Sequence, residues 1–228
     1  MLSDLKKKQQ FILFFHVSLG AMIVYPFIAR IFINAFNLDA LLSSNTINLG
    51  FDILIILSTL YLGKDLYLKS WLRFKEQSFY ATSLAFKLLP LLMLASLLFN
   101  SLAVFITHQE AATNQNLLYE LFQTSPGYMT FSALIYAPIL EEILFRGFFY
   151  GLFEKYSKVL ALIISGLVFG LAHMYTGKFS LVDLAFLPSY SVLGMIIAYS
   201  YLKTKSIFTP MLVHFLNNLV GILVMVYF

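Results

Sequence analysis

Seven apolar runs, separated by short polar stretches, dominate the hydropathy pattern of the chain. They lie at about 11–29, 47–63, 88–107, 129–153, 159–174, 181–202 and 206–228. A helix needs ~20 apolar residues to cross ~30 Å of hydrocarbon, and the second and fifth runs are short by this measure. The pattern predicts an all-α polytopic membrane bundle of about seven transmembrane helices, in one membrane domain over residues 1–228.

The basic start of the chain, Lys6 to Lys8 ahead of an apolar run, is similar to a signal peptide. The run is longer than the roughly 7–15 apolar residues of a signal core, and no small-residue cleavage site precedes Arg30. We interpret it as a retained first transmembrane helix. Further along, residues 64–80 mix basic and aromatic side chains, which fits either an interfacial amphipathic helix or a solvated loop. Residues 108–127 predict a polar loop.

The composition indicates that these segments lie in the lipid bilayer. The chain is 60% hydrophobic and 11% charged, with a mean hydropathy of +0.84. A soluble core of this size cannot bury so much apolar surface, so we expect an integral membrane protein. The formal charge of +4 does not indicate nucleic-acid binding, because the basic residues form short clusters between apolar runs. The absence of cysteine excludes disulfides, thiol catalysis and cysteine-rich zinc sites.

The basic residues also predict an orientation. If the N-terminus is cytoplasmic, Arg30 and Lys178 lie outside and Arg146 lies within a membrane run, which leaves twelve of the fifteen Lys and Arg on the cytoplasmic side. This asymmetry satisfies the positive-inside rule. The C-terminus is then expected outside, and the compartment is predicted to be the plasma membrane.

The stretch Pro138-Ile-Leu-Glu-Glu-Ile-Leu-Phe-Arg-Gly147 carries three charged side chains inside the fourth run. An ionised group at the centre of a membrane helix costs roughly 2.5–3.5 kcal/mol on insertion scales, so such groups are functional by default and need partners. Glu142 and Arg146 are four residues apart and predict a pair on one helix face. Glu141 is rotated by about 100° from Glu142 and needs a partner on another helix.

Two later runs carry the other intramembrane polar groups. Phe169-Gly-Leu-Ala-His173 lies in the fifth run, and His214-Phe-Leu-Asn-Asn218 places an imidazole and an amide on one face of the last. A lone membrane histidine is more often a helix-to-helix hydrogen bond than a catalyst. Three consecutive helices with polar groups instead predict a shared interior site. Gly166-x-x-x-Gly170 offers a small-residue packing face, and Pro138 can open the fourth helix.

These side chains fit two kinds of hydrolytic chemistry. Glu141 and His173 can together hold and deprotonate a water, while His214 and the Asn218 amide donate hydrogen bonds to an oxyanion. Alternatively, Glu141, His173 and His214 can hold a divalent metal such as zinc. Spacing does not decide whether a metal is bound. Because hydrolysis consumes water, we expect a cavity to reach the site from one aqueous side.

The three motifs resemble those of the CPBP family, the CAAX prenyl endopeptidases and bacteriocin-processing membrane proteases also called the Abi family. The resemblance covers about residues 129–228 and implies an intramembrane endopeptidase, glutamate protease or metalloprotease, acting on a hydrophobic, prenylated or secreted-peptide precursor. It implies that Glu141 and His173 activate water, that His214 and Asn218 stabilise the oxyanion, and that Glu142 and Arg146 hold the architecture. The core is thus expected over 128–228, behind three helices in 1–127 without a motif.

Two other functions stay open from the sequence. A non-catalytic bacteriocin-immunity or signalling protein would bind a peptide or sensor partner through the same pocket. A small transporter or channel would use Glu141 as a proton or ion site, although the chain shows no inverted repeat of the kind that many transporters have. The sequence indicates neither the substrate nor the oligomeric state.

Overall fold

Every element in the described part of the chain is a helix. The computed structural model describes residues 5, 7–36, 44–174 and 181–227. The first half contains α1 (Lys7–Phe15), η2 (His16–Val24), α2 (Tyr25–Ala35), α3 (Ser44–Leu62), α4 (Lys64–Glu76) and α5 (Ser78–Thr107). The second contains α6 (Thr113–Thr124), α7 (Pro126–Phe131), η4 (Ser132–Tyr136), α8 (Ala137–Glu142), η5 (Ile143–Tyr150), α9 (Gly151–Glu154), α10 (Lys158–Met174), η6 (Val182–Phe186), α11 (Leu187–Thr204) and α12 (Phe208–Tyr227).

Length and hydropathy qualify five helical stretches in this part of the chain as membrane spans. They are Asn45–Leu62, Ser78–Thr107, Pro126–Glu154, Val182–Thr204 and Phe208–Tyr227. A sixth comes from Lys8–Ala21 and Tyr25–Ala35 if this pair, bent by 50°, forms one span. The apolar α10 has 17 residues. The chain is therefore an all-α, multi-pass integral membrane protein, and the count of seven crossings stays a prediction.

Both polar stretches between the apolar runs contain a helix. The predicted polar loop at 108–127 contains the helix α6, because the carboxylate of Asp183, 70 residues away, accepts hydrogen bonds from the backbone N–H and the hydroxyl of Thr113 at the helix start. Residues 64–76 form the helix α4 rather than a loop, with Leu68, Trp71 and Leu72 exposed as the interfacial interpretation requires.

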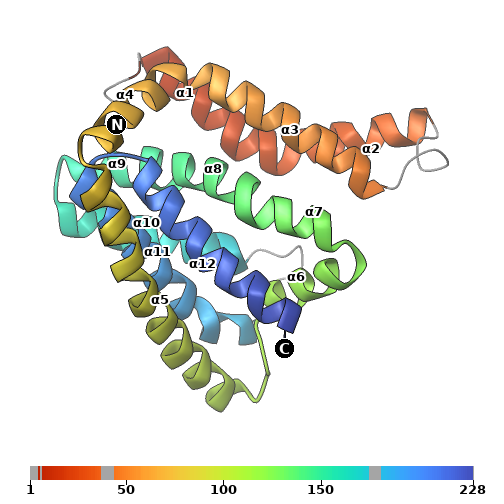
Figure 1. Cartoon of the computed structure of the whole chain (residues 1–228). Coiled ribbons are helices and arrows are strands. Elements are labelled where there is room, and N and C mark those ends of the chain that lie inside the picture. The colour runs from red at the N-terminus through yellow and green to blue at the C-terminus, as the bar shows by residue number, and fades with distance from the viewer. Residues whose placement is uncertain (1–4, 6, 37–43, 175–180, 228) are drawn as a thin grey trace.

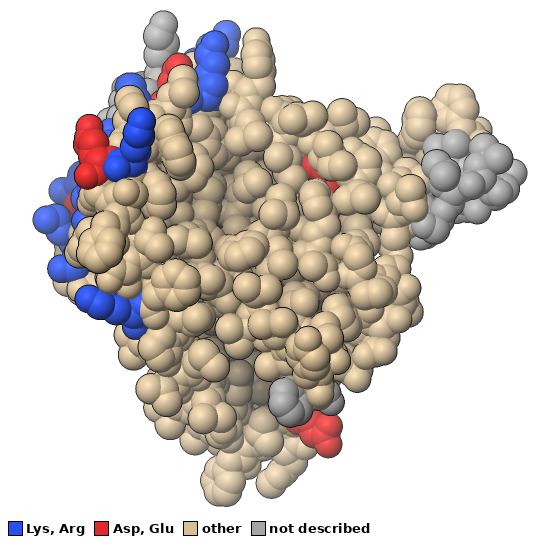
Figure 2. All heavy atoms as spheres, viewed as in Figure 1, with Lys and Arg blue, Asp and Glu red and all other residues tan. Residues whose placement is uncertain are grey.

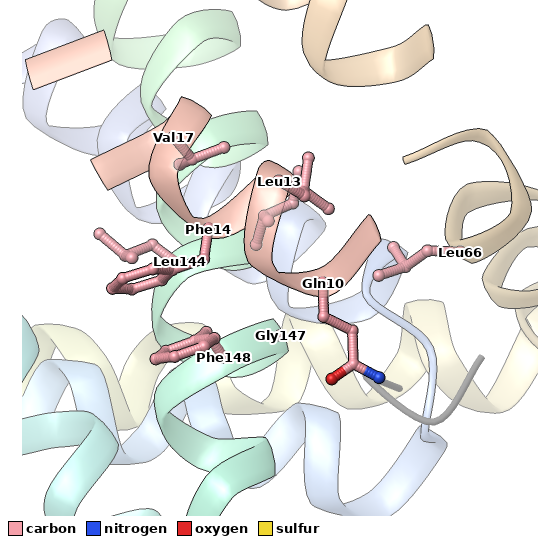
Figure 3. Close-up of a pocket in the computed structure, with 9 residues that line it drawn as sticks. Gln10, Leu13, Phe14, Val17, Leu66, Leu144, Gly147 and Phe148 are labelled. Carbon is pink, nitrogen blue, oxygen red and sulfur yellow. The ribbon is translucent and has the colours of Figure 1, made fainter. Parts of the chain in front are cut away.

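The helices form two groups that meet along the central helical run from α7 to α9 (Figure 1). In this view α1, α2 and α3 lie across the top, while α5, α10, α11 and α12 lie below. The largest buried cluster joins the groups, since it contains Leu13 of α1 and Ile55 of α3 together with Leu140, Phe145 and Phe169. Figure 3 shows the same junction from the side of α1, where Phe14 stacks on Phe148 with 3.8 Å between ring centroids.

Close contact between α10 and α11 fixes the depth of the histidine-bearing helix. A Cβ atom added to Gly166 would lie 2.3 Å from Met195 Cγ, and one added to Gly170 would lie 2.3 Å from Ser191 Oγ. A Cβ on Gly194 would lie 3.0 Å from the Gly166 Cα. The small residues therefore let the two backbones touch, which confirms the packing role predicted for the Gly166-x-x-x-Gly170 pair.

Candidate active site

The helical run that carries the two glutamates is widened just before them. The backbone N–H of Ala137 donates to the carbonyl of Ser132, five residues back, which is the π-helical register. The next bond in this register would start at Pro138, but proline has no N–H, so the Ala133 carbonyl is left without its backbone donor. Asn218 fills the vacancy, because its Nδ2 donates to that carbonyl over 2.8 Å. The Asn218 side chain thus supplies the hydrogen bond that Pro138 cannot donate.

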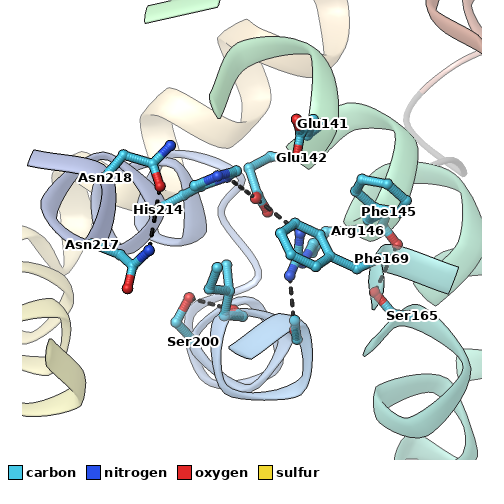
Figure 4. Close-up of polar contacts among 12 residues, drawn as sticks. Glu141, Glu142, Phe145, Arg146, Ser165, Phe169, Ser200, His214, Asn217 and Asn218 are labelled. Carbon is cyan, nitrogen blue, oxygen red and sulfur yellow. Dashed lines mark hydrogen bonds and ion pairs between the residues drawn. The ribbon is translucent and has the colours of Figure 1, made fainter. Parts of the chain in front are cut away.

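One face of α8 and η5 holds a fully buried chain of charged groups (Figure 4). Arg146 Nη1 donates to Glu142 Oε1 over 2.9 Å, which is the predicted pair, and both side chains are 0% exposed. The same carboxylate oxygen lies 2.8 Å from His214 Nδ1. Arg146 Nη2 also donates to the Gly194 carbonyl over 2.7 Å. These bonds tie α8, η5, α11 and α12 together, with each buried charge paired.

Glu141 points away from this buried chain, as Figure 4 shows. Its Oε2 has no hydrogen-bond partner and lies 4.0 Å from His173 Nε2. Both side chains keep 21% of their exposure, whereas Glu142 and Arg146 are sealed. His173 Nδ1 donates to the Phe169 carbonyl over 2.9 Å. In a neutral imidazole this leaves the Nε2 lone pair facing the carboxylate. A polar gap of 4.0 Å suits a bridging water.

Phe169 joins the two halves of the site through its ring. The ring stacks on His173 with centroids 4.3 Å apart and meets His214 edge-on at 5.8 Å. Its face also receives the Arg146 guanidinium at 5.0 Å. Tyr190 also stacks on His173, with centroids 5.1 Å apart, so two aromatic rings contact this imidazole. Phe169 is part of a sequence motif, whereas no local pattern indicates a role for Tyr190.

The six predicted site residues all lie on α8, η5, α10 and α12, but their contacts divide them. Glu141 meets His173, while Glu142 meets both Arg146 and His214. Asn218 contacts Ala133 and Asn217. Among the described residues, His214 and Asn218 make no direct hydrogen bond to Glu141 or His173. The i, i+4 spacing in α12 therefore leads to two different partners rather than to one shared contact.

The proposed metal set does not converge in this geometry. Glu141 and His173 approach each other, but His214 turns its Nδ1 toward Glu142. Within the described part of the chain, no group of three His, Asp or Glu side chains is arranged to hold a metal ion. A catalytic zinc takes three protein ligands. The donor set thus does not fit the zinc site that the sequence left open as an alternative.

The fold and site define a class: a multi-pass membrane protein with a partly exposed glutamate–histidine pair beside a sealed charge cluster. Residues 123–220 match the family of type II CAAX prenyl endopeptidases that are Rce1-like. Residues 123–220 are therefore similar to the CPBP family, which the three motifs also resemble.

Curated relatives show the same similarity. The chain is 34% identical over 116 residues to the putative membrane peptidase YdiL of Bacillus subtilis, covering 50% of this chain and 43% of the relative. It is 32% identical over 117 residues to the membrane-embedded CAAX protease MroQ of Staphylococcus aureus, covering 48% and 44%. The chain therefore matches less than half the length of either relative. No solved structure gives a match.

Proposed function

We propose that the protein is an intramembrane endopeptidase that hydrolyses a membrane-embedded peptide with a water held between Glu141 and His173. The observation that carries the proposal is the 4.0 Å gap between the unpartnered Glu141 Oε2 and His173 Nε2, in the one part of the charged cluster that keeps some exposure. The family of residues 123–220 and the names of the relatives support the reaction class.

The first step is attack by the bridging water. Glu141 takes a proton from the water as its oxygen bonds to the scissile carbonyl carbon, and His173 Nε2 accepts the hydrogen bond of the other proton. The carbonyl oxygen becomes an oxyanion. The C–N bond then breaks, and the protonated Glu141 returns its proton to the leaving amine. Phe169 and Tyr190 keep the His173 ring in place, and the bond from Nδ1 to the Phe169 carbonyl fixes its tautomer.

The oxyanion needs donors, and His214 and Asn218 are the proposed ones. His214 Nδ1 donates to Glu142, and its Nε2 becomes a second donor when that nitrogen also carries a proton. Asn218 donates one amide N–H to the Ala133 carbonyl, and its second amide N–H is the proposed donor to the oxyanion. Loss of one oxyanion donor typically lowers the rate by about 10²–10³.

The substrate class proposed is a hydrophobic, lipidated or precursor peptide that enters from the membrane. We place the N-terminus in the cytoplasm and the C-terminus outside, in the plasma membrane. Figure 2 supports this orientation, because Lys and Arg gather at one end of the molecule and leave the rest of the visible surface almost free of basic charge.

Cleavage of a peptide panel by the purified protein in detergent tests the proposal. We expect Glu141→Gln and His173→Ala to abolish cleavage, Glu76→Gln on the exposed face of α4 to leave it unchanged, and a strong chelator to have no effect. If both site variants cut as well as the parent chain, the assignment of Glu141 and His173 is wrong. If chelation stops cleavage and zinc restores it, the metal-free mechanism is wrong.

A further inference from the structure

One carboxylate in the N-terminal helices has no role in the mechanism above. Asp52 is the only charged residue in the span Asn45–Leu62 of α3. Its helix neighbours Ile53 and Leu54 are exposed on the outer face, whereas Ile55 and Ile56 are buried. Asp52 is partly exposed on the side toward the bundle. A charge in a membrane span is a functional-site hypothesis by default.

Asp52 belongs to a polar stripe along α3, whose first two members contact the start of the helical run that carries the active site. Asn45, Asp52 and Thr59 are spaced by seven residues and so share one face of α3. Asn45 donates to Ser125 just before α7, and Thr59 contacts His16 of η2. Between them, the Tyr128 hydroxyl of α7 donates to Asp52 Oδ2 over 3.1 Å.

The contacts of Asn45 and Thr59 join neutral groups. The contact between Asp52 and Tyr128 leaves the Asp52 carboxylate without a positive partner. Among the described residues, no Lys or Arg pairs with Asp52. Arg146 is committed to Glu142 at 2.9 Å. Tyr128, the partner of Asp52, lies on the same helical run as Glu141. Asp52 therefore has no cationic partner among the described residues, although it contacts the helical run that carries Glu141.

We propose that Asp52 and Tyr128 form a subsite that accepts a basic side chain of the peptide substrate. The inference rests on the proposed peptidase function and adds a specificity to it: a Lys or Arg at a fixed distance from the scissile bond. Tyr128 holds one carboxylate oxygen and leaves the other for the cation, and a carboxylate without a cationic partner favours a positive ligand.

The helix sets the distance between subsite and scissile bond. Tyr128 precedes Glu141 by thirteen residues, or roughly 20 Å at 1.5 Å per residue. An extended peptide spans that length with about six residues. The basic residue is therefore expected within about six positions of the cleaved bond, on one side of it only.

Binding to Glu141→Gln protein tests the subsite without requiring turnover. Fluorescent apolar peptides carry a single Lys, Gln or Glu, moved along six positions on either side of the centre, and anisotropy measures their affinity in detergent. We expect Lys to bind roughly tenfold more tightly than Gln at one or two adjacent positions. Asp52→Asn should erase the preference, and Asp52→Lys should turn it toward the Glu peptide.

The matched control is Asp65→Asn in α4, which should keep the preference for Lys. Equal affinity of Lys and Gln peptides at every position, absence of peptide binding, or a preference that survives Asp52→Asn would each overturn the subsite. Cleavage by the parent chain is scored separately. If peptides with Lys bind selectively but nothing is cut, the subsite stands and the peptidase proposal fails.

Discussion

Glu142, Arg146 and His214 form a sealed polar chain whose members depend on one another. The two charged side chains are 0% exposed, and each buried charge has a partner within 2.9 Å. Removing the guanidinium leaves the carboxylate buried with only the imidazole beside it. We expect Arg146→Ala to lower the free energy of unfolding by about 3–5 kcal/mol, as for other broken buried pairs. Thermal unfolding in detergent, followed by circular dichroism, measures the loss.

The pair between Glu154 and Lys205 is the matched control at this scale. Its side chains are 26% and 41% exposed, so water screens both charges. Glu154→Gln should therefore change the free energy of unfolding by less than about 1 kcal/mol. If the two variants lost equal stability, burial would not be what makes the Arg146 pair important.

At the scale of elements, the contact between α10 and α11 positions His173. Ala at Gly166 would bring a Cβ within 2.6 Å of the Ser191 carbonyl and push the helices apart. We expect Gly166→Ala to lower stability by about 1–3 kcal/mol, as overpacking does, and to reduce cleavage as well. Gly221→Ala in α12 is the control, because nothing lies within 4 Å of its added Cβ. Similar losses in both variants would show that helix packing is not the cause.

The widened turn before Glu141 separates two roles of Asn218. Asn218→Ala leaves the Ala133 carbonyl without a donor, whereas Pro138→Ala restores a backbone N–H that can reach this turn. We expect the double variant to recover most of the stability that Asn218→Ala loses. Cleavage should stay low if the amide also serves the oxyanion, and should return if it only repairs the turn. Unfolding midpoints and cleavage rates of the four proteins in the cycle decide between these roles.

The same turn explains why part of the site could not be predicted from the sequence. The pair Glu142–Arg146 follows from a spacing of four, because one helix determines it. The bond from Glu142 to His214 spans 72 residues, and no local pattern contains it. Spacing linked His214 with Asn218, but the missing proline N–H draws the amide to Ala133.

At the scale of the whole molecule, hydropathy predicted the all-α membrane bundle but not every break within it. The first run bends by 50° between Ala21 and Tyr25, and α10 has only 17 residues. Helix α6 lies where a polar loop was predicted, since its start depends on the distant carboxylate of Asp183. Apolar composition indicates which segments enter the membrane. Tertiary contacts determine where they bend, begin and end.

The two ends of the molecule carry different charge, and this difference makes the orientation testable. The basic helix α4 lies at one end of α5, and α5 leads to the opposite end of the molecule (Figure 1). Gln109, which follows α5, is exposed. Because the chain contains no cysteine, any introduced one is its sole thiol. On intact cells, a membrane-impermeant maleimide should label Gln109→Cys, but should label Glu76→Cys only after permeabilisation. The reverse pattern would place the basic end outside and contradict the proposed topology. It would also move the Asp52 subsite, whose helix starts at the less basic end, to the cytoplasmic half of the membrane.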